Sequence, residues 1–228
     1  MADVFIYGAG GLGQLVLDIL RQGQRYRPVA FLDSDPALHG VVIDGLPVAG
    51  GMDQVGELVR TGVRGGIVAV GNNHVRVTLA QELERHGVKL VSAIHPLASI
   101  SPTARLDEHV IVGARVTICV HARIGAHTVV SAGSIIEHDN VLGEGVFLYP
   151  AVRLAGTVWV EDLATLGIGA CVIPGRRIGR AARVEPGAVV IRDVAPGATV
   201  GGVPAISQPA AASRFVPEPE PVLVSAPA

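Results

Sequence analysis

A histidine between two carboxylates interrupts an otherwise apolar stretch of the chain. The segment "IIEHDNVLGEGV" (135–146) places Glu137, His138, Asp139 and Asn140 among Ile, Val, Leu and Gly. A carboxylate beside an imidazole fixes the tautomer and raises the basicity of the ring, which leaves the other nitrogen to take a proton near pH 7. We therefore expect His138, supported by Asp139, to act as a general base. A surface histidine on a turn is the alternative.

This segment belongs to a six-residue repeat. Aliphatic side chains occupy seventeen consecutive positions, one every six residues, from Ile94 to Val190. Helical periodicity cannot produce this interval, whereas a parallel β-helix does: three hexapeptides close one triangular coil, and residue n lies above residue n − 18 at ~4.8 Å. The repeat predicts about five coils between residues 94 and 193.

Asn140 departs from this repeat in a telling way. Four residues after each aliphatic position comes a second inward position, usually small or Val, and Asn140 occupies it here. A buried polar side chain costs stability unless it is hydrogen-bonded. Departures from a consistent pattern are expected at functional sites.

Three other histidines of the repeat raise the question of a metal. His109, His121 and His127 share one position of the repeat, which we expect to lie on solvent-facing turns. His109 and His127 are eighteen residues apart and should stack, so a zinc site of the γ-type carbonic anhydrase kind is a competing hypothesis. No supporting carboxylate pattern accompanies them, and we predict no metal.

Residues 1–93 follow a different pattern. Short apolar segments typical of buried strands alternate with apolar residues at helical spacing. This alternation predicts a small Rossmann-like parallel sheet flanked by helices, and thus an α/β domain. The expected strands span 4–8, 28–33, 66–71 and 89–95, and the helical residues are Leu12, Leu15, Val16, Ile19, Leu20, Val75, Leu79 and Leu83.

A glycine-rich turn follows the first strand. Gly8, Gly10 and Gly13 have the G-x-G-x-x-G spacing, and Asp33 comes twenty residues after Gly13, where a carboxylate can bind a ribose hydroxyl. NAD binding and a tight turn without a ligand are the two alternative interpretations. We favour a nucleotide diphosphate, as part of a nucleotide-sugar, because one phosphate-binding half suits one nucleotide. The residues that follow the third strand, at the edge where ligands of parallel sheets collect, are Asn72 and Asn73.

The composition excludes several classes of partner. The formal net charge is −2, so no basic surplus indicates nucleic acid or an anionic membrane. Two cysteines make no disulfide framework and fit a reducing compartment. The first residues lack a signal-peptide pattern, and no apolar run approaches the ~20 residues of a membrane span. We expect a cytoplasmic protein with neither nucleic acid nor membrane as a partner.

Several motifs together resemble one known family. "IEHD", "LAGTVWV" (154–160), "LGIGACVIPG" (166–175) and "GVPA" (202–205), with "FLDSD" and "VGNN", are similar to the sialic-acid O-acetyltransferase and nucleotide-amino-sugar N-acetyltransferase family. The resemblance implies a nucleotide-binding α/β domain joined to a left-handed β-helix, with acetyl-CoA as co-substrate. It also implies a homotrimer with CoA in the grooves between subunits. We place the domains at 1–93 and 94–206, followed by an extended or disordered tail at 207–228.

The resemblance also assigns roles to residues. It implies that His138 is the catalytic base, that Asp139 supports it, and that the Gly156 N–H, one coil above His138, binds the thioester carbonyl. It implies that the "EPGA" segment and Ile168 contact the pantetheine of CoA. The remaining expected contacts are Gly156, Pro186 and Gly187 for CoA, and Gly8, Gly10, Gly11, Asp33, Asn72 and Asn73 for the nucleotide-sugar.

Two departures from the family pattern concern the ligands. Phe147 stands where some relatives have a second histidine that contacts acetyl-CoA, and Leu12 replaces a histidine of the glycine turn. The preferred function is transfer of an acetyl group from acetyl-CoA to the amine of a nucleotide-linked amino sugar. O-acetylation of sialic acid or another sugar is the alternative, and a non-catalytic nucleotide-sugar sensor is a third hypothesis.

Overall fold

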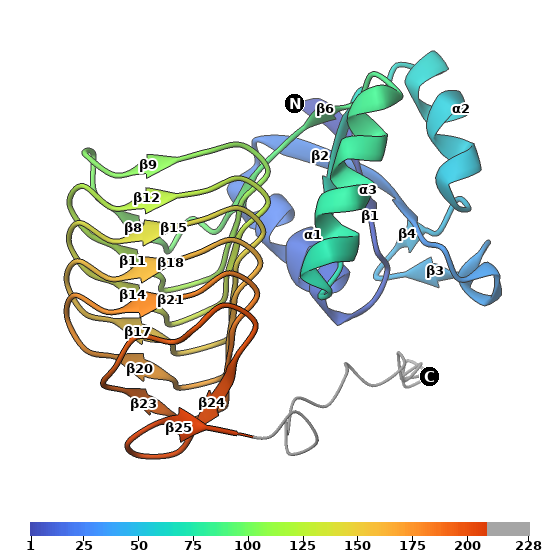
Figure 1. Cartoon of the computed structure of the whole chain (residues 1–228). Helices are drawn as coiled ribbons and strands as arrows, with labels where there is room; N and C mark the ends of the chain where they lie inside the picture. The colour runs from blue at the N-terminus through green and yellow to red at the C-terminus, as the bar shows by residue number, and fades with distance from the viewer. Residues whose placement is uncertain (209–228) are drawn as a thin grey trace, which may run out of the picture.

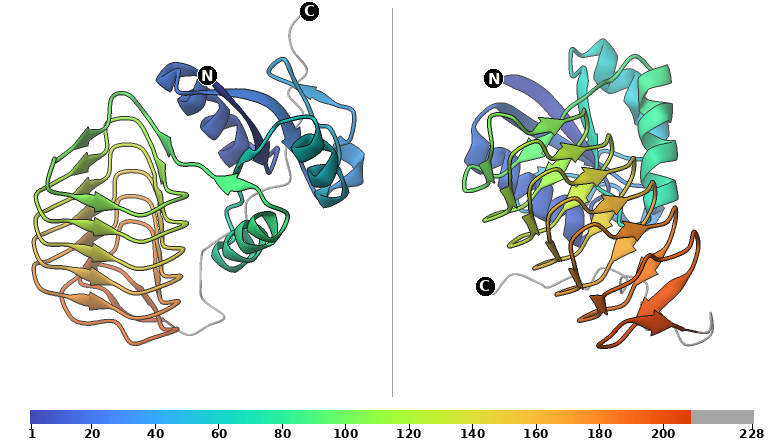
Figure 2. Two further views of the ribbon diagram at one scale, coloured as in Figure 1. Left: turned by 90° about the horizontal axis from the view of Figure 1, so that it is seen from above. Right: turned by 60° about the vertical axis from the view of Figure 1, so that its left-hand side comes forward.

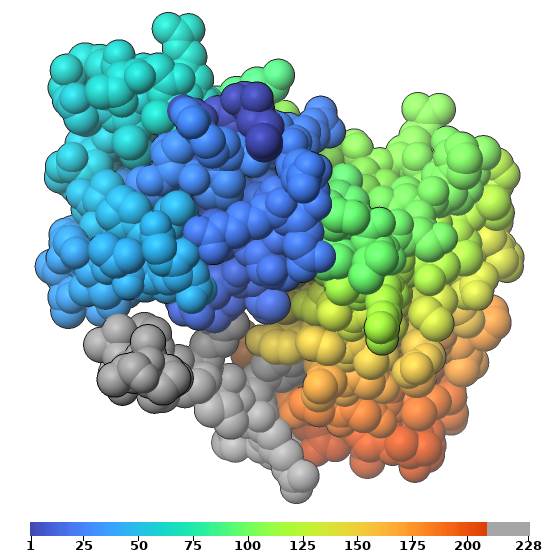
Figure 3. Space-filling model, turned by 180° about the vertical axis from the view of Figure 1, so that it is seen from behind, coloured from blue at the N-terminus to red at the C-terminus, as the bar shows by residue number. Residues whose placement is uncertain are grey.

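The computed structural model describes residues 1–208. A parallel sheet with its helices lies beside a stack of triangular coils (Figure 1). In the space-filling view the N-terminal region abuts the early coils directly (Figure 3). The predicted combination of an α/β region and a left-handed parallel β-helix is confirmed. No helix among the described residues has the length and apolar character needed to cross a membrane.

The N-terminal sheet has four parallel strands in the order β2-β1-β5-β6. Because β1 lies between β2 and β5, the chain changes direction across the sheet at β1, and the ends of these strands form the edge where ligands bind in such folds. The elements are β1 Ala2–Tyr7, α1 Gly11–Gly23, β2 Tyr26–Leu32, η1 Pro36–Leu38, β3 Val42–Ile43, β4 Leu46–Pro47, η2 Met52–Gln54, α2 Val55–Arg60, β5 Gly65–Val68, α3 Asn73–Arg85 and β6 Lys89–Leu90.

Helices cover both faces of this sheet. Val16 and Leu20 of α1 are buried on the face that looks toward the β-helix, whereas Leu15 of the same helix is 62% exposed and takes no part in the core. Val55 of α2 and Leu83 of α3 are buried on the opposite face. The helical spacing therefore identified the helices, but not every apolar residue in them faces inward.

The β-helix consists of short strands, all of two residues except β24, that stack in three parallel sheets, here called the first, second and third faces (Figure 2). The first face contains β7 Ala93–Ile94, β10 Ile111–Val112, β13 Val129–Val130, β16 Phe147–Leu148, β19 Thr165–Leu166, β22 Arg183–Val184 and β24 Thr199–Gly201. The second face contains β8 Ser99–Ile100, β11 Thr117–Ile118, β14 Ile135–Ile136, β17 Arg153–Leu154, β20 Cys171–Val172 and β23 Val189–Val190. The third face contains β9 Arg105–Leu106, β12 Arg123–Ile124, β15 Val141–Leu142, β18 Trp159–Val160 and β21 Arg177–Ile178.

The six-residue repeat sets both the core and the corners of each coil. Its aliphatic residues fill the interior, and the second inward position holds residues without exposed surface such as Val116, Ala122 and Thr128. Every sixth residue from His109 to Gly187 has a positive φ, so each corner turns through the left-handed region. Strands pair with those eighteen residues away, as predicted.

The coil continues further than the repeat predicts. β24 pairs with β22 although Thr199 follows its partner Arg183 by only sixteen residues, which is why the six-residue spacing ends at Val190. The β-helix makes about six turns, against the predicted five. A short antiparallel strand, β25 Ile206–Ser207, closes it. The rest of the predicted tail, 209–228, lies outside the described residues.

The first face of the β-helix packs against the N-terminal region. Ile111, Val129 and Phe147 point outward from this face and are buried in one cluster with Val16 and Leu20 of α1. Burial of aliphatic and aromatic surface favours this association by roughly 25 cal/mol per Å². The two regions therefore share a core, which fixes the sheet edge relative to the coils.

Candidate functional site

His138 and Asp139 lie at the corner between the second and third faces, just after β14. His138 Nδ1 and Asp139 Oδ2 are 2.8 Å apart, and both side chains are half exposed. Asp139 has a φ of 58° and donates its N–H to Val120 O at 3.1 Å, so the corner of the coil below fixes its backbone. The carboxylate accepts a hydrogen bond from the Nδ1–H, which leaves Nε2 as the basic nitrogen.

Gly156 lies one coil above this imidazole. Thr157 N–H donates to His138 O at 3.0 Å, which brings the two corners together. A Cβ on residue 156 would overlap the His138 ring, with Nε2 as the nearest atom, so the ring occupies the space that a side chain would take. Within residues 1–208 the Gly156 N–H donates no hydrogen bond to the protein. A basic nitrogen and a free N–H donor are therefore adjacent.

Asn140, the polar residue in an inward position, is fully buried and hydrogen-bonded. Its amide nitrogen donates to Glu137 O at 2.8 Å, and its amide oxygen accepts the Val158 N–H at 2.6 Å. These bonds close the turn that carries His138 and join it to the coil above. Asn140 thus supports the site from inside and does not reach it.

The residues expected along the CoA track lie at a different corner. Ile168 is 54% exposed at the corner between the first and second faces, and Gly187 N–H donates to Ile168 O at 2.8 Å from the next coil. Pro186 precedes Gly187 in that corner. The second face separates this group from His138 and Gly156, so one chain does not bring the two groups together.

The glycine turn and Asp33 form a third group, at the edge of the N-terminal sheet. Gly8 has a φ of 110°, and a Cβ there would lie 2.5 Å from Ala69 O. A Cβ on Gly13 would overlap Gly8 O, so these two glycines are required by close backbone contact. Asp33 Oδ2 accepts the Ala9 N–H at 2.8 Å and thereby fixes the turn.

The other residues expected to bind the nucleotide have mixed surroundings. A Cβ on Gly10 or Gly11 would meet nothing within 4 Å, so space remains beside this end of α1. Asn72 caps α3 by accepting the Val75 N–H at 3.1 Å. Asn73 points to the β-helix, where it donates to Leu163 O at 2.9 Å and to Thr165 Oγ1 at 3.0 Å. Contact of these residues with a nucleotide stays a prediction.

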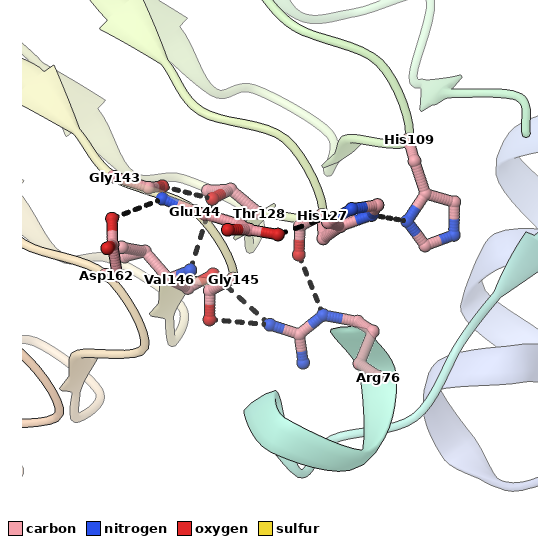
Figure 4. A network of polar contacts seen from close by, with 9 residues as sticks. All are labelled: Arg76, His109, His127, Thr128, Gly143, Glu144, Gly145, Val146 and Asp162. Carbon is pink, nitrogen blue, oxygen red and sulfur yellow. Dashed lines mark hydrogen bonds and ion pairs between the residues drawn. The ribbon is translucent and has the colours of Figure 1, made fainter. Parts of the chain in front are cut away.

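A buried arginine that the sequence patterns do not single out joins the two regions (Figure 4). Arg76 of α3 has no exposed surface and donates to His127 O at 2.8 Å and Gly145 O at 3.0 Å in the coils, and to Asn73 Oδ1 at 2.8 Å. Burial lowers the pKa of Arg76 to about 10, so the guanidinium stays charged at neutral pH. The available signal was its position three residues after Asn73, on the same helix face.

The prediction of solvent-facing turns is wrong for His109 and His127, which are 1% and 6% exposed. The N-terminal region covers their corner. His109 Nε2 accepts the Val68 N–H at 2.8 Å, so its proton is on Nδ1, which donates to His127 Nδ1 at 2.9 Å. His127 Nε2 then faces Glu144 Oε1 at 3.6 Å.

These surroundings keep both rings neutral. Burial, with electrostatic repulsion from the neighbouring His127 and Arg76 side chains, lowers the pKa of His109 to about 3, and burial also lowers the pKa of His127. Both nitrogens of His109 are engaged in hydrogen bonds. Among the described residues there is no group of three or more His, Cys, Asp or Glu that could hold a metal ion.

Both departures from the family pattern are explained by packing. Phe147 is 4% exposed, lies 4.6 Å from the Tyr149 ring, and has the Arg76 guanidinium 5.5 Å above its centroid. Leu12 is 8% exposed in the same interface cluster. An apolar side chain at each position therefore belongs to the contact between the two regions.

Comparison with known proteins follows this division of the chain. Residues 3–83 match the PglD N-terminal domain. The chain is 37% identical to GDP-perosamine N-acetyltransferase from Caulobacter crescentus, a histidine-to-alanine mutant in complex with CoA and GDP-perosamine, with a TM-score of 0.88 over 92% of this chain and 98% of the other. It is 28% identical to the acetyltransferase domain of PglB from Neisseria gonorrhoeae, in complex with acetyl coenzyme A, with a TM-score of 0.85 over 90% and 98%.

A curated relative is similar over a shorter region. GDP-perosamine N-acetyltransferase of Escherichia coli O157:H7 is 30% identical over 108 residues, or 47% of this chain, and the chain spans about half of that relative, 49%. The solved Caulobacter enzyme, in contrast, is covered over nearly its whole length at more than 30% identity. With its PglD-type N-terminal domain and its left-handed β-helix, the chain belongs to the family of hexapeptide-repeat sugar acetyltransferases.

Proposed function

We propose that the protein transfers the acetyl group of acetyl-CoA to the amine of a nucleotide-linked amino sugar. The observation that carries this proposal is the contact between the His138 imidazole, held by Asp139, and Gly156, whose N–H donates no hydrogen bond to any described residue. The similarity to enzymes solved with CoA and GDP-perosamine supports the classes of both substrates. The family shown by the comparisons fits this chemistry.

The geometry suggests a direct transfer. His138 Nε2 takes a proton from the amine as the amine nitrogen attacks the thioester carbon, and a C–N bond forms. The carbonyl oxygen becomes an oxyanion, which the Gly156 N–H stabilises. The C–S bond then breaks, and the imidazolium returns its proton to the CoA sulfur, so the enzyme ends in its starting state.

The nucleotide would bind at the edge of the N-terminal sheet. Gly10 and Gly11 leave space there, the Asp33 carboxylate is partly accessible, and β1 and β5 end at the same edge. A helix N-terminus at such an edge favours a phosphate. The shared core between this region and the first face holds that edge at a fixed place relative to the coils.

We also propose a homotrimer. The two groups of residues assigned to CoA lie at different corners of the β-helix, so a groove between neighbouring subunits would bring them together. Large apolar side chains remain exposed on the coils, and exposed apolar patches are typical of protein interfaces. They include Val120, Trp159, Ile168, Ile173 and Ile191.

O-acetylation is the second candidate. One relative, an acyl-[acyl-carrier-protein]–UDP-N-acetylglucosamine O-acyltransferase of Agrobacterium fabrum, is 32% identical over 136 residues and is covered over 49% of its length. A base that deprotonates an amine can also deprotonate a hydroxyl. The acceptor therefore has to be identified by experiment.

The test is a thiol-release assay with acetyl-CoA and a panel of nucleotide-linked amino sugars, together with sialic acid. We expect turnover only with an amino sugar, and turnover of sialic acid alone would replace N- by O-acetylation. His138→Ala should lower kcat by ~10²–10⁴-fold with little change in KM. The control is His86→Ala, an exposed residue at the end of α3. Full activity of the His138 variant would show that the base lies elsewhere.

A further inference from the structure

Two arginines stack on the third face, and neither is paired with a counter-charge among residues 1–208. Arg105 of β9 and Arg123 of β12 are direct partners in the parallel pairing of these strands, so their side chains leave the sheet side by side at the ~4.8 Å strand spacing. Both are exposed. Like charges directly opposite each other destabilise a sheet. Such a pair needs a reason to be there.

Nothing in the described chain neutralises this pair. Within residues 1–208 neither guanidinium forms an ion pair or a side-chain hydrogen bond. Arg177, in the same outward position three coils further along, gives the opposite picture: it pairs with Glu161 and lies 5.6 Å from the centroid of the Trp159 ring. An arginine on this face can therefore pair with another residue of the chain, whereas Arg105 and Arg123 have no such partner in the described part of the chain.

The pair borders a hollow in the surface whose other polar groups are also donors. The residues that line it are Pro102, Thr103, Ala104, Arg105, His121 and Arg123, among which there is no carboxylate. Asp107 and Glu144 lie in the adjoining hollow, which the same two arginines share. The first hollow thus offers two forked guanidiniums, an imidazole and a hydroxyl, a set that matches phosphate oxygens.

This hollow lies next to the corner that carries His138. His121 is eighteen residues before Asp139, and Val120 O accepts the Asp139 N–H at 3.1 Å, so the two corners are in contact. In Figure 1, β9 and β12 form the uppermost two rungs of their face. An anion bound there would be anchored one coil away from the proposed base.

We infer that Arg105, Arg123 and His121 bind the diphosphate group of a substrate. The inference rests on the proposed function, because both the nucleotide-linked sugar and CoA carry a diphosphate. If the nucleotide-linked sugar is the source, its diphosphate lies here and not at the N-terminus of α1. The common chemistry is two adjacent phosphates bridging two stacked guanidiniums. The bound diphosphate offsets the repulsion between the two arginines, whereas in the free enzyme this repulsion remains.

The first test measures binding of inorganic pyrophosphate to the full chain by isothermal titration calorimetry. Wild type should bind, and Arg105→Gln/Arg123→Gln should bind at least about tenfold more weakly, because charge-assisted hydrogen bonds to two phosphates are lost. The matched control, Arg64→Gln/Arg85→Gln, removes the same charge from exposed sites on the N-terminal region and should bind as wild type does. The arginine-pair variant should melt no earlier than wild type, since a repulsive contact has been removed.

The second test identifies the source of the diphosphate. In the double variant the KM for only one substrate should rise by about tenfold: that of acetyl-CoA if the site holds CoA, or that of the nucleotide-sugar if it holds the acceptor. If the double variant binds pyrophosphate as tightly as wild type does and its KM values are unchanged, the inference is overturned. The inference is also overturned if the double variant binds pyrophosphate as wild type does but has a smaller oligomeric mass, because the arginines would then belong to contacts between copies of the chain. Failure of acetyl transfer by wild type would overturn the proposed function and leave the pyrophosphate result to stand on its own.

Discussion

Asn140 shows at the scale of one residue how a polar side chain can serve a site without touching it. Its position in the repeat predicted a functional departure, and the structure gives it a structural task, since both ends of its amide are bonded inside the coil. The turn with His138 begins at Glu137, whose carbonyl Asn140 holds. The prediction was thus right that the repeat breaks beside the candidate base, and the reason is support of the turn.

Asn140→Ala should therefore destabilise the protein. The buried Val158 N–H and the partly buried Glu137 carbonyl would lose their partners, and the unpaired N–H alone costs about 1–3 kcal/mol. Urea unfolding followed by circular dichroism would measure the loss. Ser134→Ala is the matched control, because Ser134 occupies the same inward position and makes only one bond, to Tyr149 O at 3.2 Å. Equal stability of the two variants would contradict this account.

Gly156 is a glycine for reasons of space. Its φ is not in the left-handed region, yet a Cβ there would overlap the His138 ring. Gly156→Ala should therefore displace the imidazole and lower kcat by on the order of 10²-fold, as misplacement by about 1 Å can do. Gly56→Ala, at a position in α2 where a Cβ meets nothing within 4 Å, should keep full activity. Normal turnover of the Gly156 variant in a thiol-release assay would argue against this contact.

At the scale of elements, the joint between α3, β5 and the coil corners has a built-in acid sensitivity. His109 is held neutral by burial and by the Val68 N–H, which a protonated Nε2 could not accept. Its pKa in the folded state, about 3, is below the unfolded value of 6.5. The unfolded chain therefore binds the extra proton first, and stability falls as pH drops from about 6.5 toward 3.

His109→Gln should weaken this dependence. Each histidine that stays neutral in the folded state contributes up to about 1.4 kcal/mol of lost stability per pH unit in that window. Urea unfolding at pH 6.0 and 5.0 should show a slope smaller by about that amount in the variant. His86→Gln, an exposed change, should retain the wild-type slope. Parallel pH profiles for all three proteins would show that His109 does not carry the effect.

The docking of these elements could not be predicted from the sequence, and the reason is physical. Arg76 binds main-chain carbonyls of His127 and Gly145, which any residue presents, so no side-chain pattern encodes the partner. Likewise, Ile111 and Phe147 occupy outward positions that the repeat alone assigns to solvent. The coil itself was predictable, because a six-residue interval has few structural solutions. The last turn of the coil was not predictable, because its strands pair at a spacing of sixteen residues and not the eighteen of the repeat.

At the scale of the whole molecule, the proposed assembly makes a direct prediction. Light scattering on the purified chain should give three times the monomer mass of 23.5 kDa. Trp159→Glu, which places a charge on an apolar residue that is 50% exposed, should lower that mass if the third face packs against a neighbour. Val42→Glu, at an exposed residue of β3 in the N-terminal region, is the control. A monomeric wild type at assay concentration would contradict the trimer.

The hydrogen bonds from Arg76 of α3 to main-chain carbonyls have a consequence for how the two regions are aligned. Every coil of the β-helix presents equivalent main-chain carbonyl oxygens at the same corner, so Arg76 cannot by itself distinguish one coil from the next. The side chains that distinguish the correct coil are those of His109 and Thr165. His109 accepts a hydrogen bond from the Val68 N–H, and the Thr165 hydroxyl accepts one from the Asn73 amide. These two side chains therefore fix the alignment of the coils with the N-terminal region. Deleting one complete turn between them would leave Arg76 with equivalent main-chain carbonyls, but would move His138 by ~4.8 Å, out of reach of the acceptor amine.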